Sequence, residues 1–133
     1  MGVGLPFAVG AKAAKPGAQV ICLHGDGSFG QNAMELDTAV RHKLPLLCII
    51  SLNGGWTADP EGDKPGRYLG YTRYDIMAQG LGCHGEYVEQ PEEIRPALER
   101  AQKQVDEGRV ALVNIKTDYR ARAGTVQFSD YST

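Results

Sequence analysis

Two short polar loops carry the residues of this chain that could do chemistry. Residues 25–30 read Gly-Asp-Gly-Ser-Phe-Gly, and residues 53–55 read Asn-Gly-Gly. The carboxylate of Asp26 and the amide oxygen of Asn53 are hard oxygen donors. Mg²⁺ commonly binds one carboxylate together with phosphate oxygens of a ligand. The two loops therefore predict a site for a cation and a phosphate-bearing molecule, provided that the fold brings them together.

Each loop follows a short apolar run that predicts a buried parallel strand, residues 20–23 before the first loop and residues 46–50 before the second. A right-handed crossover between parallel strands brings both loops to the same carboxyl edge of the sheet, where open α/β sheets bind ligands. Asp26 and Asn53 can therefore converge, although they lie twenty-seven positions apart.

A helix is predicted between these two strands. Asn32 and Glu35 fit the N-cap and N3 positions of a capping box. Ala33, Leu36 and Val40 repeat at helical spacing and predict its buried face.

Residues 25–30 also match the G-x-G-x-x-G pattern of dinucleotide-binding folds, so an NAD-binding module is an alternative. Such a fold expects an acidic residue at the end of the second strand, whereas here that strand runs into Leu52 and Asn53. The carboxylate of Asp26 would also face a pyrophosphate, and two like charges ~4 Å apart repel by about 4 kcal/mol at an effective dielectric near 20. A divalent cation between them reverses the sign of that interaction.

The two loops together resemble the signature of the thiamine diphosphate (ThDP) enzymes, Gly-Asp-Gly followed at this distance by Asn-Asn. In the branch that includes acetolactate synthase, the second Asn of the pair falls on Asn53. Leu52 stands in place of the first Asn, which is not a metal ligand in the family. The resemblance implies that Asp26, Asn53 and the carbonyl of Gly55 hold Mg²⁺.

The same resemblance implies a set of cofactor contacts. The amides of residues 27–29, in the loop that begins at Gly25, would hold the diphosphate. Residues 1–6, Met-Gly-Val-Gly-Leu-Pro, match a family motif in which the Met contacts the bend between thiazolium and pyrimidine. Met1 is either such a contact or a plain initiator residue. The implied cofactor-binding residues are Met1, Gly25, Gly27, Ser28, Phe29, Asn53, Gly55 and Trp56.

The implied fold is α/β, a doubly wound, mostly parallel sheet. In the family this domain begins with a strand and a helix upstream of the Met-Gly motif, so the resemblance implies a truncated domain over residues 1–117. Residues 118–133 form a polar tail that is either mobile or folds over the active site. In the second case Arg120 and Arg122 would approach the phosphates of an acyl-CoA.

Later segments predict the remaining elements. Residues 7–14 predict a small-residue helix, residues 72–82 a short helix capped by Gly82, and residues 85–88 and 110–115 two further strands. Residues 90–93 start a longer helix, with Pro96 expected near its first turn. The loop of residues 54–71 is too rich in Gly and Pro for a regular element. Within it, Trp56 either lines a substrate channel or packs the loop, and Arg67 and Lys64 either meet an anionic substrate or are solvated.

Residues 73–77, with the pattern Arg-Tyr-Asp-x-Met, resemble the oxalyl-CoA decarboxylase and 2-hydroxyacyl-CoA lyase branch of the family. That branch is the first choice for the intact enzyme, and an acetolactate synthase-like carboligase is the alternative. No catalytic residue is assigned in this chain. The Glu that activates the cofactor in the family lies in another domain, so the chain alone is expected to be inactive and to self-associate.

Composition excludes other classes of function. The chain has 133 residues and a formal net charge of −2, which predicts one soluble domain that does not bind nucleic acid. No apolar run approaches the about 20 residues that span a bilayer, so we expect no membrane contact and a cytoplasmic location. The expected partners are a small-molecule substrate and further copies in a homo-oligomer.

The cysteines and histidines show no metal-ligand spacing. The three cysteines are predicted to be buried free thiols. His24, at the end of the first strand, is predicted to be a histidine with satisfied hydrogen bonds rather than a ligand.

Overall fold

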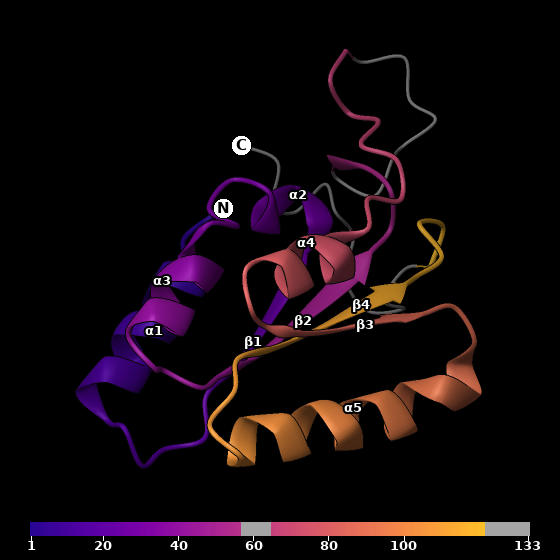
Figure 1. Cartoon of the computed structure of the whole chain (residues 1–133). Coiled ribbons are helices and arrows are strands. Elements are labelled where there is room, and N and C mark those ends of the chain that lie inside the picture. Colours follow the sequence, from indigo (N-terminus) through magenta and orange to yellow (C-terminus); the bar gives the residue numbers. More distant parts are fainter. Residues whose placement is uncertain (57–64, 122–133) are drawn as a thin grey trace.

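The computed structural model describes residues 1–56 and 65–121. The elements are, in order, α1 (Gly4–Ala14), β1 (Ile21–Gly25), α2 (Asp26–Phe29), α3 (Glu35–Arg41), β2 (Leu47–Leu52), α4 (Tyr74–Gly80), β3 (His84–Val88), α5 (Pro91–Asp106) and β4 (Ala111–Lys116). The strands form one parallel sheet in the order β1-β2-β4-β3. Figure 1 shows α5 on one face of the sheet and the other helices on the opposite face. The predicted doubly wound α/β fold is confirmed.

The two central strands, β2 and β4, are buried on both faces, which explains why their sequences are continuous apolar runs. On the face toward α1, α3 and α4, the core includes Cys22, Cys48, Ile50 and Leu112. Toward α5, it is built from Leu47, Ala111, Val113 and small residues of that helix. The three cysteines are free and buried, as predicted.

Small residues allow helices to lie close to the sheet. A side chain at Gly4, the first residue of α1, would place its Cβ 2.7 Å from Cε1 of His24. Similarly, a Cβ at Gly85 in β3 would collide with the backbone carbonyl of Asp75 in α4. A larger residue at either position would therefore force its neighbour to shift, the His24 ring at Gly4 and the backbone of α4 at Gly85.

Several boundaries differ from those predicted. The prediction of Asn32 as an N-cap is wrong: α3 begins at Glu35, its N-cap is Met34, and no side chain caps it. The polar side chain of Asn32 is instead used in a tertiary hydrogen bond, described below. The start of α5 at Pro91 agrees with the prediction, and Pro96 lies just after the first turn, near which it was expected.

Two loops have more structure than predicted. The segment predicted as a glycine loop begins with Gly25, the last residue of β1. It continues directly into the single turn of α2. The loop of residues 54–71 contains one isolated antiparallel bridge, between Gly55 and Tyr68. The helix predicted from residue 72 begins at Tyr74, and Gly82 follows its end with a φ of +94°, as expected of a C-terminal glycine.

Among the residues that the structure describes, no helix is long and apolar enough to cross a membrane.

Candidate cofactor-binding site

The two predicted loops meet at the carboxyl edge of the sheet. β1 and β2 are neighbours, with Gly25 in register with Ser51. The carboxylate of Asp26 bridges the loops: its Oδ2 accepts a hydrogen bond of 2.7 Å from the N–H of Gly54, and its Oδ1 accepts one of 2.8 Å from the N–H of Gly27. The convergence of Asp26 with the Asn53 loop, predicted from the crossover, is thus observed.

Asp26 is a buried carboxylate, with 2% of its surface exposed. Burial raises the pKa of the Asp26 carboxyl, and backbone N–H donors, Gly54 first among them, partly oppose that shift. Among the described residues, the groups that oppose the shift are backbone N–H donors, so peptide dipoles compensate the negative charge there. A divalent cation beside this carboxylate would offset the remaining burial cost.

Residues 53–56 are held by a second segment, residues 65–69. Gly55 and Tyr68 form the isolated antiparallel bridge, and their neighbours exchange two backbone hydrogen bonds of 2.8 and 2.9 Å. The N–H and C=O of Gly55 therefore point away from residues 65–69. The N–H of Gly55 donates to Oδ1 of Asn53 at 3.2 Å. The Asn53 amide oxygen therefore lies on the side of the backbone that faces away from residues 65–69.

These oxygen donors fit a hard cation better than a soft one. In the described part of the chain, no three His, Cys, Asp or Glu side chains gather as a metal site. The candidate set is one carboxylate, one side-chain amide and one backbone carbonyl. Mg²⁺ is usually bound in this way, by one or two carboxylates, with water and substrate phosphates completing its octahedron.

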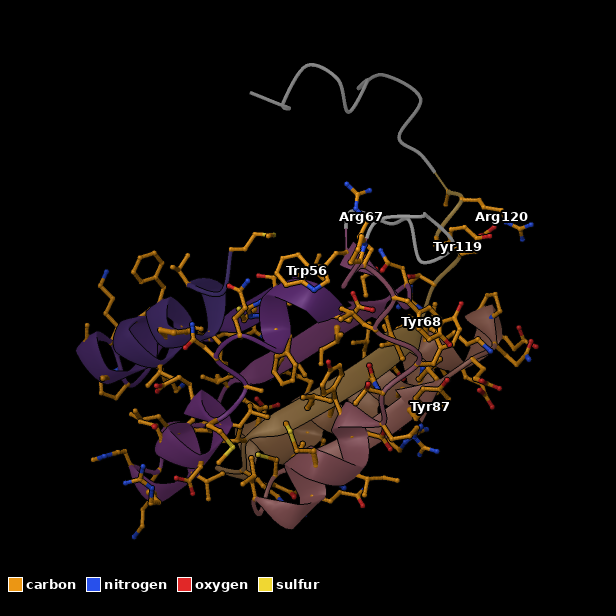
Figure 2. The ribbon with its side chains drawn as sticks, turned by 90° about the horizontal axis from the view of Figure 1, so that it is seen from above. Trp56, Arg67, Tyr68, Tyr87, Tyr119 and Arg120 are labelled. Atoms are coloured by element: carbon orange, nitrogen blue, oxygen red, sulfur yellow. The ribbon has the colours of Figure 1, made fainter. Side chains whose placement is uncertain are left out.

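Trp56 covers the turn of α2. A Cβ at Gly27 would lie 3.1–3.2 Å from atoms of the Trp56 ring, and Figure 2 shows the ring over α2. A small cavity opens beside this contact, lined by Gly27, Gly30, Gln31, Trp56, Leu69 and Tyr74. Trp56 thus packs against α2 and lines a small cavity, and its role in a substrate channel stays a prediction.

Aromatic side chains pack against one another at α2. Phe29 is buried and makes edge-to-face contacts with Tyr74, at a centroid distance of 5.0 Å, and with His24, at 6.0 Å. Nε2 of His24 lies 2.7 Å from Sγ of Cys22, so its ring is hydrogen-bonded inside the fold. Burial lowers the pKa of His24, which favours the neutral imidazole. The prediction of a satisfied strand-end histidine is confirmed.

Sequence reasoning missed Tyr74 and Leu69 as residues of this cavity. Tyr74 shows the helical spacing of a core residue, and its ring does pack against the core, so periodicity alone could not reveal that its hydroxyl reaches Gly30. Leu69 carries no signal in the sequence, because its place depends on how residues 65–69 fold back.

The predicted cationic contacts have different outcomes. Lys64 and Arg122 lie outside the described residues. Arg120 pairs with Asp118 at 3.1 Å. The backbone carbonyl of Arg67 accepts the bond from Trp56. A role for these side chains toward an anionic substrate stays a prediction.

Comparison with known proteins identifies the domain. Residues 1–115 match the family model "Thiamine pyrophosphate enzyme, C-terminal TPP binding domain". The chain belongs to this family. This membership favours a ThDP site over the dinucleotide alternative.

Similar proteins contain this TPP-binding domain within longer chains. "2-Hydroxyacyl-CoA lyase 2" of Bos taurus is 40% identical over 131 residues, which cover 90% of this chain and 21% of the relative. A "Probable acetolactate synthase" of Mycobacterium bovis is 43% identical over 127 residues, with 89% and 22% covered. The chain therefore spans about a fifth of the length of these relatives.

A solved structure agrees with the fold. The thiamine diphosphate-dependent 4-hydroxybenzoylformate decarboxylase of Rhodococcus jostii RHA1 superimposes with a TM-score of 0.79 at 32% identity. The match covers 89% of this chain and 23% of that one. The sheet described above is thus the ThDP-binding fold.

Proposed function

We propose that this domain anchors the diphosphate of ThDP through Mg²⁺. The observation that supports the proposal most directly is the convergence of Asp26 with the Asn53 loop. The N–H of Gly54 in that loop donates a hydrogen bond to the Asp26 carboxylate. Asp26, Asn53 and the Gly55 carbonyl would bind the cation. The diphosphate would lie against the turn that begins at Gly25.

The residues of that turn have distinct parts in the proposed site. The N–H of Gly27 donates to Asp26 and so holds the carboxylate in place. The N–H groups of Ser28 and Phe29 lie in the first turn of α2, where backbone donors have no partner within the helix. Trp56 would cover this turn and, with Met1, border the organic part of the cofactor.

ThDP supplies the electron sink for cleaving or forming a carbon–carbon bond next to a carbonyl. The chain contributes binding, orientation and the exclusion of water by Trp56 and Tyr74. We assign no catalytic residue here and place the activating Glu in another domain of the intact enzyme.

For the intact enzyme we propose a 2-hydroxyacyl-CoA lyase or decarboxylase that acts on a small-molecule substrate such as an acyl-CoA, as a cytoplasmic homo-oligomer. The Arg-Tyr-Asp-x-Met pattern of residues 73–77 and the similarity to 2-hydroxyacyl-CoA lyase 2 support this choice. The similarity to a probable acetolactate synthase supports a carboligase as the second candidate.

Calorimetric titration of the full-length protein with ThDP, with and without Mg²⁺, tests the anchoring role. Asp26→Ala removes the only anionic ligand of the proposed metal site, so Mg²⁺-dependent binding should disappear. Asn53→Leu should weaken binding less, because water can partly replace a neutral ligand. Asp106→Ala, at the far end of α5, is the matched control and should bind as the parent does.

Two results would count against the proposal. Unchanged ThDP affinity in Asp26→Ala would remove Asp26 from the metal site. Binding of NAD in place of ThDP by the parent protein would favour the dinucleotide alternative.

A further inference from the structure

The segment before α1 is held against α2 and the turn that follows it by two hydrogen bonds. The N–H of Gly2 donates to Oγ of Ser28 at 3.0 Å, and Nδ2 of Asn32 donates to the carbonyl of Gly2 at 2.9 Å. We call these two hydrogen bonds the Gly2 clasp. The first bond fixes the peptide unit between Met1 and Gly2, and the second fixes the unit between Gly2 and Val3.

Only glycine fits at position 2. Its φ is +81°, in the left-handed region that L side chains rarely adopt. A Cβ would also collide with Oε1 of Gln31 and lie 3.1 Å from Nδ2 of Asn32. The backbone of Gly2 is therefore packed directly against the turn, and Figure 1 shows the N-terminus beside α2.

The residues on either side of Gly2 are exposed although their backbone is held. Gly2 is buried, whereas Met1 is 76% and Val3 is 52% exposed. An exposed, flexible methionine next to a fixed peptide is suited to contact a second molecule. Part of the conformational entropy that binding costs is already lost, because the backbone is held before binding.

Ser28 connects the clasp to the proposed diphosphate site. Its hydroxyl accepts the hydrogen bond from Gly2 and keeps its own hydrogen to donate. If that hydrogen is donated to a phosphate oxygen, the two bonds polarise and strengthen each other. The clasp and the anion site are thus joined at a single side chain.

We propose that Asn32 is a positioning residue that, with Ser28, clasps Gly2 and so presents the side chain of Met1 to the thiamine cofactor. This inference rests on the function proposed above. It assigns a role to Asn32 that the sequence, with its apparent capping box, conceals.

Hydrogen exchange without cofactor tests the clasp by itself. In the full-length protein, Asn32→Ala should speed exchange of the Gly2 amide by roughly three- to tenfold, the effect of one hydrogen bond. Asn32→Asp keeps the shape but cannot donate, and it should act in the same direction. Met34→Ala, an exposed residue of the same turn, is the control and should leave the exchange of the Gly2 amide unchanged.

A double-mutant cycle then tests the positioning role. With Mg²⁺ present, Asn32→Ala should raise the dissociation constant of ThDP roughly three- to tenfold. In a Met1→Ala background the same substitution should have almost no further effect, because there is no longer a Met1 side chain to position. A purely structural role would instead weaken binding by the same factor in both backgrounds, which would overturn the proposal.

The two hypotheses fail in different ways. If the parent protein does not bind ThDP, the proposed function is wrong and the positioning role falls with it. If the parent binds ThDP but Asn32→Ala leaves amide exchange and affinity unchanged, the clasp proposal alone is refuted.

Discussion

Asp26 combines features that oppose each other in a protein without ligands. Its carboxylate is buried, which disfavours the charged form and raises its pKa. Its two oxygens accept backbone hydrogen bonds from Gly27 and Gly54, which favour that form. A fold gains little from such a residue unless a cation joins it. Local conflicts of this kind are expected at functional sites.

Two glycine substitutions should have opposite effects on stability. A methyl group at Gly27 meets the Trp56 ring at 3.1 Å, so Gly27→Ala should lower the free energy of unfolding by about 1–3 kcal/mol. Gly10 lies within α1 with nothing within 4 Å of its Cβ position. Gly10→Ala should therefore raise stability by up to about 1 kcal/mol.

Urea denaturation measures both changes. Trp56 is the single tryptophan of the chain, so its emission should also shift in Gly27→Ala and stay as in the parent in Gly10→Ala. Equal stability changes in the two variants would show that Trp56 does not rest on Gly27.

At the scale of elements, the sheet was predictable because the sequence patterns of its strands are local. β2 and β4 are continuous apolar runs because both of their faces are buried, and β1 ends where the glycine motif begins. The right-handed crossover then placed Asp26 beside the Asn53 loop without any knowledge of contacts.

Polar side chains with distant partners were not predictable. Asn32 has the type and spacing of an N-cap, yet its partner is Gly2, thirty positions away. Asparagine can satisfy either role, and only the folded chain decides between them. For the same reason the bridge between Gly55 and Tyr68 was missed, since an isolated pair has no periodic pattern.

The position of α4 depends on an ion pair between the buried Asp75 and the half-exposed Arg73. Asp75 is buried, and its two carboxylate oxygens accept hydrogen bonds of 2.9 and 2.7 Å from Arg73. Burial raises the pKa of the Asp75 carboxyl, but the hydrogen bonds and charge of Arg73, together with bonds from the Asp75 backbone and Asn114, hold the pKa below its usual value. Asn114, buried in β4, donates to the carbonyl of Thr72 and fixes the same segment.

Asp75→Asn should therefore lower the free energy of unfolding at neutral pH by about 1–2 kcal/mol. Because the folded-state pKa is lowered, the stability that ionised Asp75 contributes is present above its unfolded pKa. It is lost as pH falls through the folded pKa. The difference between parent and variant should accordingly shrink below about pH 4, near the ordinary pKa of Asp.

Denaturation by urea at several pH values checks this dependence. Asp37→Asn is the matched control, since Asp37 also pairs with an arginine, Arg41, but at the surface. Its effect should stay within about 0.5 kcal/mol. A difference for Asp75→Asn that does not vary with pH would contradict the ionic explanation.

At the scale of the whole molecule, the two faces of the sheet are covered unequally. α1, α3 and α4 close one face over β1, β2 and β4. On the other face α5 covers β3 and β4 but leaves β1 bare, so Ile21 and Leu23 are 52% and 72% exposed. A groove lies there between the strands and α5, lined in part by Leu47, Ile49, Ile94 and Leu98.

This bare face should make the 133-residue chain self-associate. Within the described residues β1 is an edge strand, and exposed apolar side chains beside such an edge favour pairing with another copy. Leu23→Lys places a charge in the centre of the bare face, and it should weaken association by about tenfold or more, the effect of losing one buried leucine. Phe7→Lys is the matched control, because Phe7 is 71% exposed but lies on α1, on the covered side of the sheet.

Light scattering over a wide range of concentrations measures the mass of each variant. A parent chain that stays monomeric throughout, or a Phe7→Lys variant that dissociates as readily as Leu23→Lys, would show that the face over β1 is not what brings the copies together.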